Sequence, residues 1–348
     1  MIAATARQVD VIIPLYNNEI YAVEAIKSVL AQTYPVRNVI VVDDGSTDSS
    51  ATIIEQHFAE DARVCIIRGD HRGLPATRNR GIAESDADFI AFLDSDDLWL
   101  PIKIEQQIKR FDDCPDAGAI YCDYTIINEK GIPVPHIYRD PPRLHGDIFN
   151  ALLEGNLLSG SASAIIIKRA LFAQAGLFDE SLSFAEDWDM WLRLAKIAKI
   201  EFVDQPLVLI RRHERQMSSA APPLRSLRDF VQHLRIWSKW PDEVLSNHRV
   251  INKIRAGILE LYLRPVIAFK RRQALLRIMS QQVHFNLHPA IRCIICDSFT
   301  YSDSRHRLRI WAICLCSPGA MMRILVGRSF PRLRSFKKEL STIWAKRK

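Results

Sequence analysis

The sequence of 348 residues predicts an α/β fold, in which a mostly parallel sheet carries helices on both faces and a basic α-helical region follows. In roughly the first hundred residues, near-continuous hydrophobic runs of strand length alternate with helix-length segments, which is typical of buried parallel strands joined by crossover helices. Charge is also divided unevenly, because residues 211–348 contain 28 Lys and Arg against 8 Asp and Glu. We therefore expect a domain over residues 1–218 and a helical region over 219–348.

The expected strands are near-continuous hydrophobic runs. In the first part of the chain they lie at 9–14, 39–42, 64–67 and 89–93. Helices are expected at 22–30, around 76–82 and, between them, after the second strand, where Ser46 or Thr47 would cap the helix. Beyond Trp99 the pattern predicts a helix at 101–112, strands at 119–124, 163–167 and 207–213, a short helix at 168–174 and a helix near Glu186. Residues 132–146 are expected to form a loop. The segments that follow the parallel strands should gather at one sheet edge, where ligands bind in open α/β folds.

Composition and missing motifs exclude several classes of protein. The hydrophobic share of 48% and the charged share of 25% are those of a globular protein. We find no run of 18 apolar residues and, after the first strand, no glycine-rich dinucleotide or Walker motif. Seven cysteines, without a signal peptide, indicate free thiols and a cytoplasmic location. Zinc binding at 293–296 and 314–316 is the weaker alternative, because the second spacing does not fit.

Acidic residues stand at the ends of two predicted strands and at the start of a helix. Asp43-Asp44 follow the second strand, and Asp94, Asp96 and Asp97 follow the fourth. Carboxylates held side by side repel each other and favour a divalent cation that also binds substrate phosphates. The alternative is that these residues cap the helices that follow them.

Asp187 and His213 are further candidates for the site. Asp187 precedes Trp188, and partial desolvation of its carboxylate would raise its proton affinity and suit a general base. Capping of its helix by Glu186 or Asp187 is the alternative. His213 follows Arg211 and Arg212, and a cationic pair beside an imidazole suits a diphosphate leaving group and its metal. A surface histidine fits the same pattern.

Five segments resemble the motifs of family 2 glycosyltransferases, the inverting GT-A-fold enzymes of bacterial polysaccharide synthesis. In chain order they are VIIPLYN (11–17), VVDDGSTD (41–48), TRNRGI (77–82), FLDSDD (92–97) and EDW (186–188). The resemblance covers residues 7–218 and does not reach the basic region. It implies a GT-A (Rossmann-like) fold and transfer of a sugar, with inversion, from a nucleoside diphosphate sugar to an acceptor hydroxyl, in surface polysaccharide, O-antigen or capsule synthesis.

The resemblance also implies which residues bind the nucleotide sugar. They are Pro14, Tyr16, Asn17, Asp43, Asp44, Arg78, Asp94 and Ser95. Asp44 would accept the N–H of the base, with Asp43 as the second candidate, and Asp94 would reach the ribose.

The same resemblance implies a metal site and a catalytic base. Asp96 would bind Mg²⁺ or Mn²⁺ that bridges the diphosphate, with His213 as a further metal contact. Asp187 matches the base that takes a proton from the acceptor. Asp97 has no ligand role in this assignment and is expected to cap the next helix.

The basic region, with a net charge of +20 over residues 211–348, has three interpretations. Its charge balances the acidic domain, binds an anionic membrane surface, or binds nucleic acid. Basic amphipathic segments with Trp and Leu favour the membrane surface, and no nucleic-acid-binding motif is present.

We therefore expect three partners: a UDP-sugar donor, a saccharide or lipid-linked saccharide acceptor, and the inner face of the cell membrane. Nucleic acid is not expected. Two rival hypotheses are a catalytically silent nucleotide-sugar-binding scaffold protein of the same fold and a nucleotidyltransferase.

Overall fold

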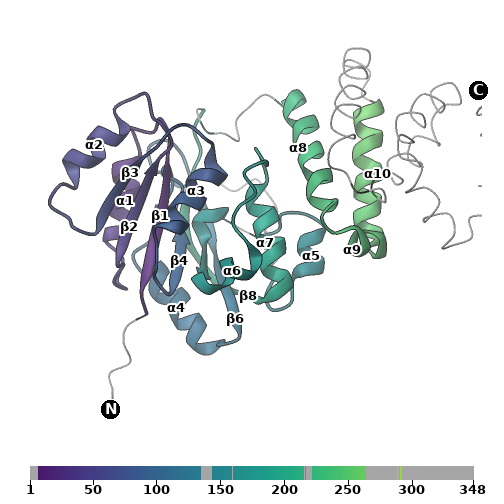
Figure 1. Ribbon diagram of the computed structural model, residues 1–348, viewed down its shortest axis with the longest axis horizontal. Coiled ribbons are helices and arrows are strands. Elements are labelled where there is room, and N and C mark those ends of the chain that lie inside the picture. Colours follow the sequence, from purple (N-terminus) through teal and green to yellow (C-terminus); the bar gives the residue numbers. More distant parts are fainter. Residues whose placement is uncertain are drawn as a thin grey trace, which may run out of the picture. The chain divides into compact units, whose positions relative to one another are not determined.

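The computed structural model describes residues 7–134, 143–158, 160–214, 216, 222–263, 288 and 291 (Figure 1). Its compact units divide between Ile236 and Trp237, beyond the boundary at 218 that the sequence suggested. The second unit includes α9 (Pro241–Ser246) and α10 (His248–Leu263). Most of α8 (Pro222–Trp237) belongs to the first unit, where Arg235 donates to the Ser181 carbonyl at 2.9 Å.

The first unit is built on an eight-stranded sheet with the order β3-β2-β1-β4-β7-β6-β8-β5. The strands are β1 (Val9–Leu15), β2 (Asn38–Asp43), β3 (Val64–Arg68), β4 (Phe89–Phe92), β5 (Leu98–Trp99), β6 (Ala117–Ile127), β7 (Ile165–Lys168) and β8 (Lys199–Arg211). Strands β1 to β4 pair in parallel, and β7 is antiparallel to both β4 and β6. Strand β6 therefore runs in the same direction as β4, and so does β8, because it is parallel to β6.

Helices cover both faces of this sheet, as the sequence predicts. They are α1 (Ala22–Leu30), α2 (Ser50–His57), α3 (Leu74–Ala83), α4 (Lys103–Asp113), α5 (Phe149–Leu153), α6 (Phe172–Ala175) and α7 (Glu186–Ile197). Buried residues of α1, α2 and α4 share one core cluster with the odd-numbered residues of β1. On the other face α3 lies against β1, and a Cβ at Gly81 would clash with Ile12. Phe178, which precedes α7, packs edge-on against Phe92 and Trp191.

The differences from the predicted elements have simple causes. β5 has two residues and α5 has five, which is too short for a periodic pattern to be recognised. β8 begins at Lys199, not at 207. The sequence did not reveal its first half as a strand, because that half carries exposed polar residues. The predicted cap of α2 is wrong: the helix begins at Ser50, whose N–H donates to the Asp48 carboxylate at 3.0 Å.

The described residues bear on two expectations, one about free cysteines and one about membrane-spanning helices. Cys65, Cys114 and Cys122 are free thiols, and the other four cysteines lie outside the described part. Within that part, no helix has the length and apolar character needed to cross a membrane.

Candidate active site

The candidate site lies where the parallel strands end. The acidic residues after β2 and β4 and the histidine after β8 reach the same sheet edge, because these strands run in one direction. Ligands in open α/β sheets bind at this edge. The first residues of α7 join this group through the contacts of Arg78.

Arg78, a buried residue of α3, connects two acidic motifs. It is 2% exposed, and its guanidinium donates to Asp94 Oδ1 at 2.9 Å and to Glu186 Oε1 at 2.8 Å. Asp187 interacts electrostatically with the same guanidinium. Both terminal nitrogens of Arg78 are therefore committed to carboxylates, so that it holds the end of β4 against the start of α7. Its contact with a nucleotide stays a prediction.

Asp96 and His213 form the pair that the resemblance assigns to a metal. His213 Nε2 lies 3.0 Å from Asp96 Oδ2. Burial and the charge of Asp94 raise the pKa of Asp96, and the hydrogen bond with His213 opposes this change. In the part of the chain that the structure describes, no three His, Cys, Asp or Glu side chains group around a common metal position. Two ligands suffice where substrate phosphates supply the others, so the donor set fits a metal shared with a diphosphate.

Asp97 does not cap the next helix, and this prediction is wrong. Helix α4 begins at Lys103, and no side chain caps it. Asp97 is buried and accepts hydrogen bonds from Ser163 Oγ at 2.7 Å and from the Arg211 N–H at 3.0 Å. Burial raises its pKa well above the ordinary value, and the neighbouring Asp96 and Asp94 add to this shift. Asp97 therefore joins the end of β4 to β8 and to the segment before β7.

Arg211, which the sequence placed beside a diphosphate with Arg212, is a buried structural residue. Its guanidinium donates to the backbone carbonyls of Asp96 at 2.9 Å and Glu129 at 3.0 Å, and to the Glu24 carboxylate at 2.7 Å. It also lies 4.5 Å from the ring centre of Tyr21. These contacts fix the backbone of Asp96 and leave Arg211 committed to the protein.

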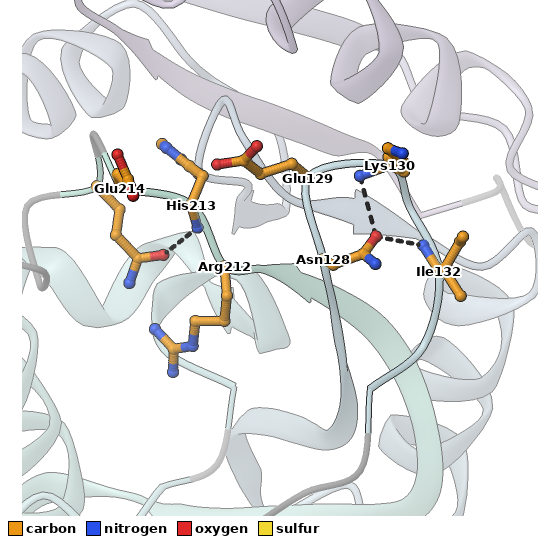
Figure 2. Close-up of a pocket in the computed structure, with 8 residues that line it drawn as sticks. Asn128, Glu129, Lys130, Ile132, Arg212, His213 and Glu214 are labelled. Atoms are coloured by element: carbon orange, nitrogen blue, oxygen red, sulfur yellow. Dashed lines mark hydrogen bonds between the residues drawn. The ribbon is translucent and has the colours of Figure 1, made fainter.

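Next to His213 is a pocket of about 740 Å³ (Figure 2). Its lining comes from the turn after β6 and the residues after β8: Asn128, Glu129, Lys130, Ile132, Arg212, His213, Glu214 and Gln216. The Asn128 side chain shapes the turn by accepting from the N–H groups of Lys130 and Ile132, both at 3.0 Å. The pocket therefore presents charges of both signs beside the candidate metal ligand.

Asp187, the candidate base, is the second residue of α7. Its Oδ1 accepts from the Trp188 N–H at 2.7 Å, and its Oδ2 accepts from Asn156 Nδ2 at 3.0 Å. Burial raises the pKa of Asp187, while Arg78 and both hydrogen bonds oppose the shift. The buried Trp188 donates from Nε1 to the Leu152 carbonyl at 2.6 Å and anchors the start of the helix. Asp187 thus satisfies a free N–H at the helix start and also has the raised proton affinity of a base.

Sequence reasoning missed the segment 155–163, which contacts the acidic residues from the other side. Besides Asn156, Ser161 Oγ donates to Asp94 Oδ2 at 3.3 Å, and Ser163 Oγ accepts from the Asp94 N–H at 3.0 Å. Ser161 has a φ of 53°, a conformation that residues other than glycine rarely adopt and that is often found at functional sites. The available signal was weak: two glycines and three serines in a short stretch between predicted elements.

The predicted base-binding residue, Asp44, stands beside two aromatic rings. Its Oδ1 accepts from the Arg72 N–H at 2.8 Å, and its Oδ2 accepts from the Gly73 N–H at 2.9 Å. His71 Nδ1 is 2.8 Å from the same Oδ2. The His71 ring stacks on the exposed Tyr16 ring, with centroids 4.2 Å apart. An aromatic face next to a buried carboxylate suits a planar base with an N–H donor.

The other predicted nucleotide-sugar residues hold the neighbouring loops together. Asp43 accepts from a backbone N–H in the turn after β2 at 3.1 Å. Asn17 Oδ1 accepts from the Thr47 N–H at 2.7 Å. Ser95 Oγ accepts from a side-chain amide of the loop after β1 at 2.9 Å, and Pro14 is buried within β1. The structure therefore brings these residues to one edge, and their ligand contacts stay predictions.

The chain is similar to known proteins in sequence and in fold. Residues 10–175 match the model of glycosyl transferase family 2. An uncharacterized glycosyltransferase of Rickettsia typhi is 28% identical over 274 residues, which cover 77% of this chain and 81% of that protein. Chondroitin synthase of Escherichia coli is 27% identical over 197 residues, 57% of this chain and 28% of that protein.

The fold also matches a solved structure. S. aureus TarS, residues 1–349 in complex with UDP-GlcNAc, superposes with a TM-score of 0.57 and 18% identity, covering 88% of this chain and 83% of that one. This likeness bears on the fold, and the sequence matches bear on the family. The chain is therefore a glycosyltransferase of the GT-A fold, and its residues 10–175 match glycosyl transferase family 2.

Proposed function

We propose that this glycosyltransferase moves a sugar from a nucleoside diphosphate sugar to an acceptor hydroxyl, with inversion of configuration at the anomeric carbon. A UDP-sugar is the expected donor. One observation carries the proposal: Arg78 joins Asp94 to Glu186 and places Asp187 beside them, so that the predicted donor site and the predicted base form one charged group. The solved structure of TarS with UDP-GlcNAc supports the choice of donor class.

In this proposal Asp187 acts as the general base. Its ionised carboxylate takes the proton of the acceptor hydroxyl as that oxygen attacks the anomeric carbon. The bond to the diphosphate breaks on the opposite face, and its electron pair leaves with the nucleoside diphosphate. One displacement inverts the configuration, and no second carboxylate is needed to form a covalent intermediate.

The donor would bind across the ends of β1, β2 and β4. Tyr16 and His71 offer stacking surface to the base, and Asp44 offers a carboxylate to its N–H. Asp94 would accept from the ribose hydroxyls. Because Arg78 and Ser161 already hold this carboxylate, it needs little reorganisation when the donor binds.

Asp96 and His213 would hold Mg²⁺ or Mn²⁺ together with the donor phosphates. When bound, such a metal neutralises the charge that develops on the departing diphosphate. Arg211 supports this function by fixing the Asp96 backbone.

We further propose a saccharide or lipid-linked saccharide acceptor in the synthesis of a surface polysaccharide. The similarity to chondroitin synthase supports a polysaccharide product. The net charge of +20 over residues 211–348 would attract an anionic membrane surface that carries a lipid-linked acceptor. Most of these residues lie outside the described part, so this proposal rests on composition.

A donor screen tests the proposed reaction. The purified full chain is incubated with UDP-, GDP- and dTDP-sugars in Mn²⁺ or Mg²⁺, and release of the nucleoside diphosphate is measured with and without saccharide acceptors. We expect release from a UDP-sugar, its loss in EDTA and its recovery when Mn²⁺ is restored. Silence with every donor would favour the scaffold hypothesis, and full activity in EDTA would refute the metal site.

A further inference from the structure

We propose that Asn156 is a positioning residue for Asp187: its side-chain amide orients the carboxylate so that a free lone pair faces the acceptor hydroxyl. The proposal rests on the proposed function, in which Asp187 is the base. It concerns a residue that belongs to none of the five sequence motifs, in the segment between α5 and β7.

The geometry around Asp187 leaves little freedom for its side chain. Asn156 Nδ2 donates to Oδ2 at 3.0 Å, and the Trp188 N–H donates to Oδ1 at 2.7 Å. A carboxylate has about four lone-pair positions. With one hydrogen bond to each oxygen, rotation of the group is restricted while two positions stay open for a proton donor.

Charged groups approach Asp187 from three elements. Burial is the main cause that raises the pKa of Asp187; Arg78 of α3 opposes this shift, and Asp94 after β4 adds to it. The neighbouring Glu186 of α7 carries a like charge, and Asp187 raises its pKa. A base that is already protonated cannot accept the acceptor proton, so the site needs donors that favour the anion.

An asparagine suits this task because its amide donates a hydrogen bond without adding a charge. A lysine or arginine in its place would form an ion pair with Asp187 and weaken it as a base. The Asn156 amide therefore limits the rise in pKa while leaving a raised proton affinity. In this way the residue sets the pH at which Asp187 becomes active.

The rest of the segment acts on the carboxylates at the other end of the site. Ser161 donates to Asp94, and Ser163 donates to Asp97. One stretch of chain thus supplies hydrogen-bond donors to both predicted halves of the reaction. The left-handed φ of 53° at Ser161 indicates that the surrounding contacts hold this backbone in place.

Direct titration of Asp187 tests the proposal without any substrate. The full chain is labelled with ¹³C at aspartate Cγ, the Asp187 signal is identified by its loss in Asp187→Asn, and its midpoint is followed with pH. In Asn156→Ala we expect the midpoint to rise by up to about one pH unit, because one hydrogen bond to the anion is lost and water, which reaches the exposed Asn156, replaces it only in part. Asn156→Gln, which keeps the amide, should recover part of the shift.

The acidic limb of the pH–turnover profile should move in the same direction and by a similar amount. Asn247→Ala is the matched control: it removes an amide that accepts from the N–H groups of Arg249 and Val250 in the second unit, and it should leave the Asp187 midpoint unchanged. If Asn156→Ala does not fold, Asn156→Leu provides an apolar side chain of similar size.

The outcomes separate the two proposals. An unchanged Asp187 midpoint in the folded Asn156 variants overturns the role of Asn156, whatever their turnover. A shifted midpoint without a shifted pH–turnover profile also overturns it, since the orientation would then not serve catalysis. Undiminished turnover of Asp187→Asn overturns the base assignment of the proposed function instead.

Discussion

Two buried cations lie on opposite faces of the sheet, and the protein stabilises them in different ways. Arg78 on α3 makes ion pairs with Asp94 and Glu186. Lys103 on α4 is 0% exposed, and its ammonium has neutral partners: Gln107 Oε1 at 2.9 Å and the Trp99 ring centre at 3.8 Å. The surroundings of Arg78 raise its pKa, whereas burial lowers the pKa of Lys103 to about 8.

The comparison distinguishes Arg78, whose charge holds residues of the candidate site together, from Lys103, whose side chain contributes to packing. Removing one partner of a buried ion pair leaves the other uncompensated, so that Arg78 cannot be changed alone. The ammonium of Lys103 contacts the Gln107 side chain and the Trp99 ring rather than a carboxylate, and an apolar side chain can replace it at low cost. The comparison therefore predicts that substitution by methionine has a large effect at Arg78 and a small one at Lys103.

Arg78→Met should have the largest effect. It leaves the buried Glu186 and the partly buried Asp94 without their cation, and we expect the free energy of unfolding to fall by about 3–5 kcal/mol. Turnover should be lost as well, because the end of β4 is no longer held against α7. Urea unfolding followed by circular dichroism measures the first effect, and nucleoside diphosphate release measures the second.

Arg72→Met is the matched control for this change. The Arg72 side chain is exposed and pairs with Glu180 at 2.8 Å. Exposed pairs contribute little, so its stability should change by less than about 1 kcal/mol. Equal losses in the two variants would refute the view that the buried ion pairs of Arg78 hold the site together.

Asp187→Asn should lower turnover without lowering stability, unlike a change of Arg78. It keeps the size of the side chain and removes the base, so we expect turnover to fall by roughly 10²- to 10⁴-fold. Burial raises the pKa of Asp187 in the fold, and removal of its charge should therefore not lower stability. Calorimetric titration with UDP should give an unchanged affinity. Retained turnover would remove Asp187 from the role of base.

The sequence predicted the half of the site that lies on regular elements. Strands β1, β2 and β4 are mostly hydrophobic runs, so their ends at Leu15, Asp43 and Phe92 could be placed within a residue or two. Asp187 was found because Trp188 and Trp191 recur at helical spacing, which places it in the first turn of α7, and because it matches a family motif. These signals are local, and burial alone explains them.

The contacts that complete the site could not be predicted, because they join residues far apart in the sequence. Asn156 reaches Asp187 across 31 residues, and Arg211 reaches the Asp96 carbonyl across 115. Polar residues in a loop have no periodicity that would reveal their partners. The reversed direction of β7 was missed for a related reason: a buried hydrophobic run has the same pattern in either direction.

Lys103→Met should have the smallest effect and tests the other side of the comparison. The unfolded chain binds the lysine proton up to about pH 10.5, whereas the folded protein releases it near pH 8. Between these values unfolding takes up a proton, so stability rises with pH. We expect native protein to gain about 1 kcal/mol between pH 8 and 9 relative to Lys103→Met. Urea unfolding at the two pH values measures this difference, and turnover should be unchanged.

The window from pH 8 to 9 matters because a second buried group opposes Lys103 at higher pH. Burial raises the pKa of Cys122 from 9.0 to about 11, so that above pH 9 the unfolded chain loses a thiol proton that the folded protein keeps, and stability then falls. Cys122→Ala should therefore extend the rise caused by Lys103 towards pH 10.5. If native protein and Lys103→Met respond equally to pH, the ammonium of Lys103 is compensated in the fold as fully as the guanidinium of Arg78, and the contrast between the two faces of the sheet disappears.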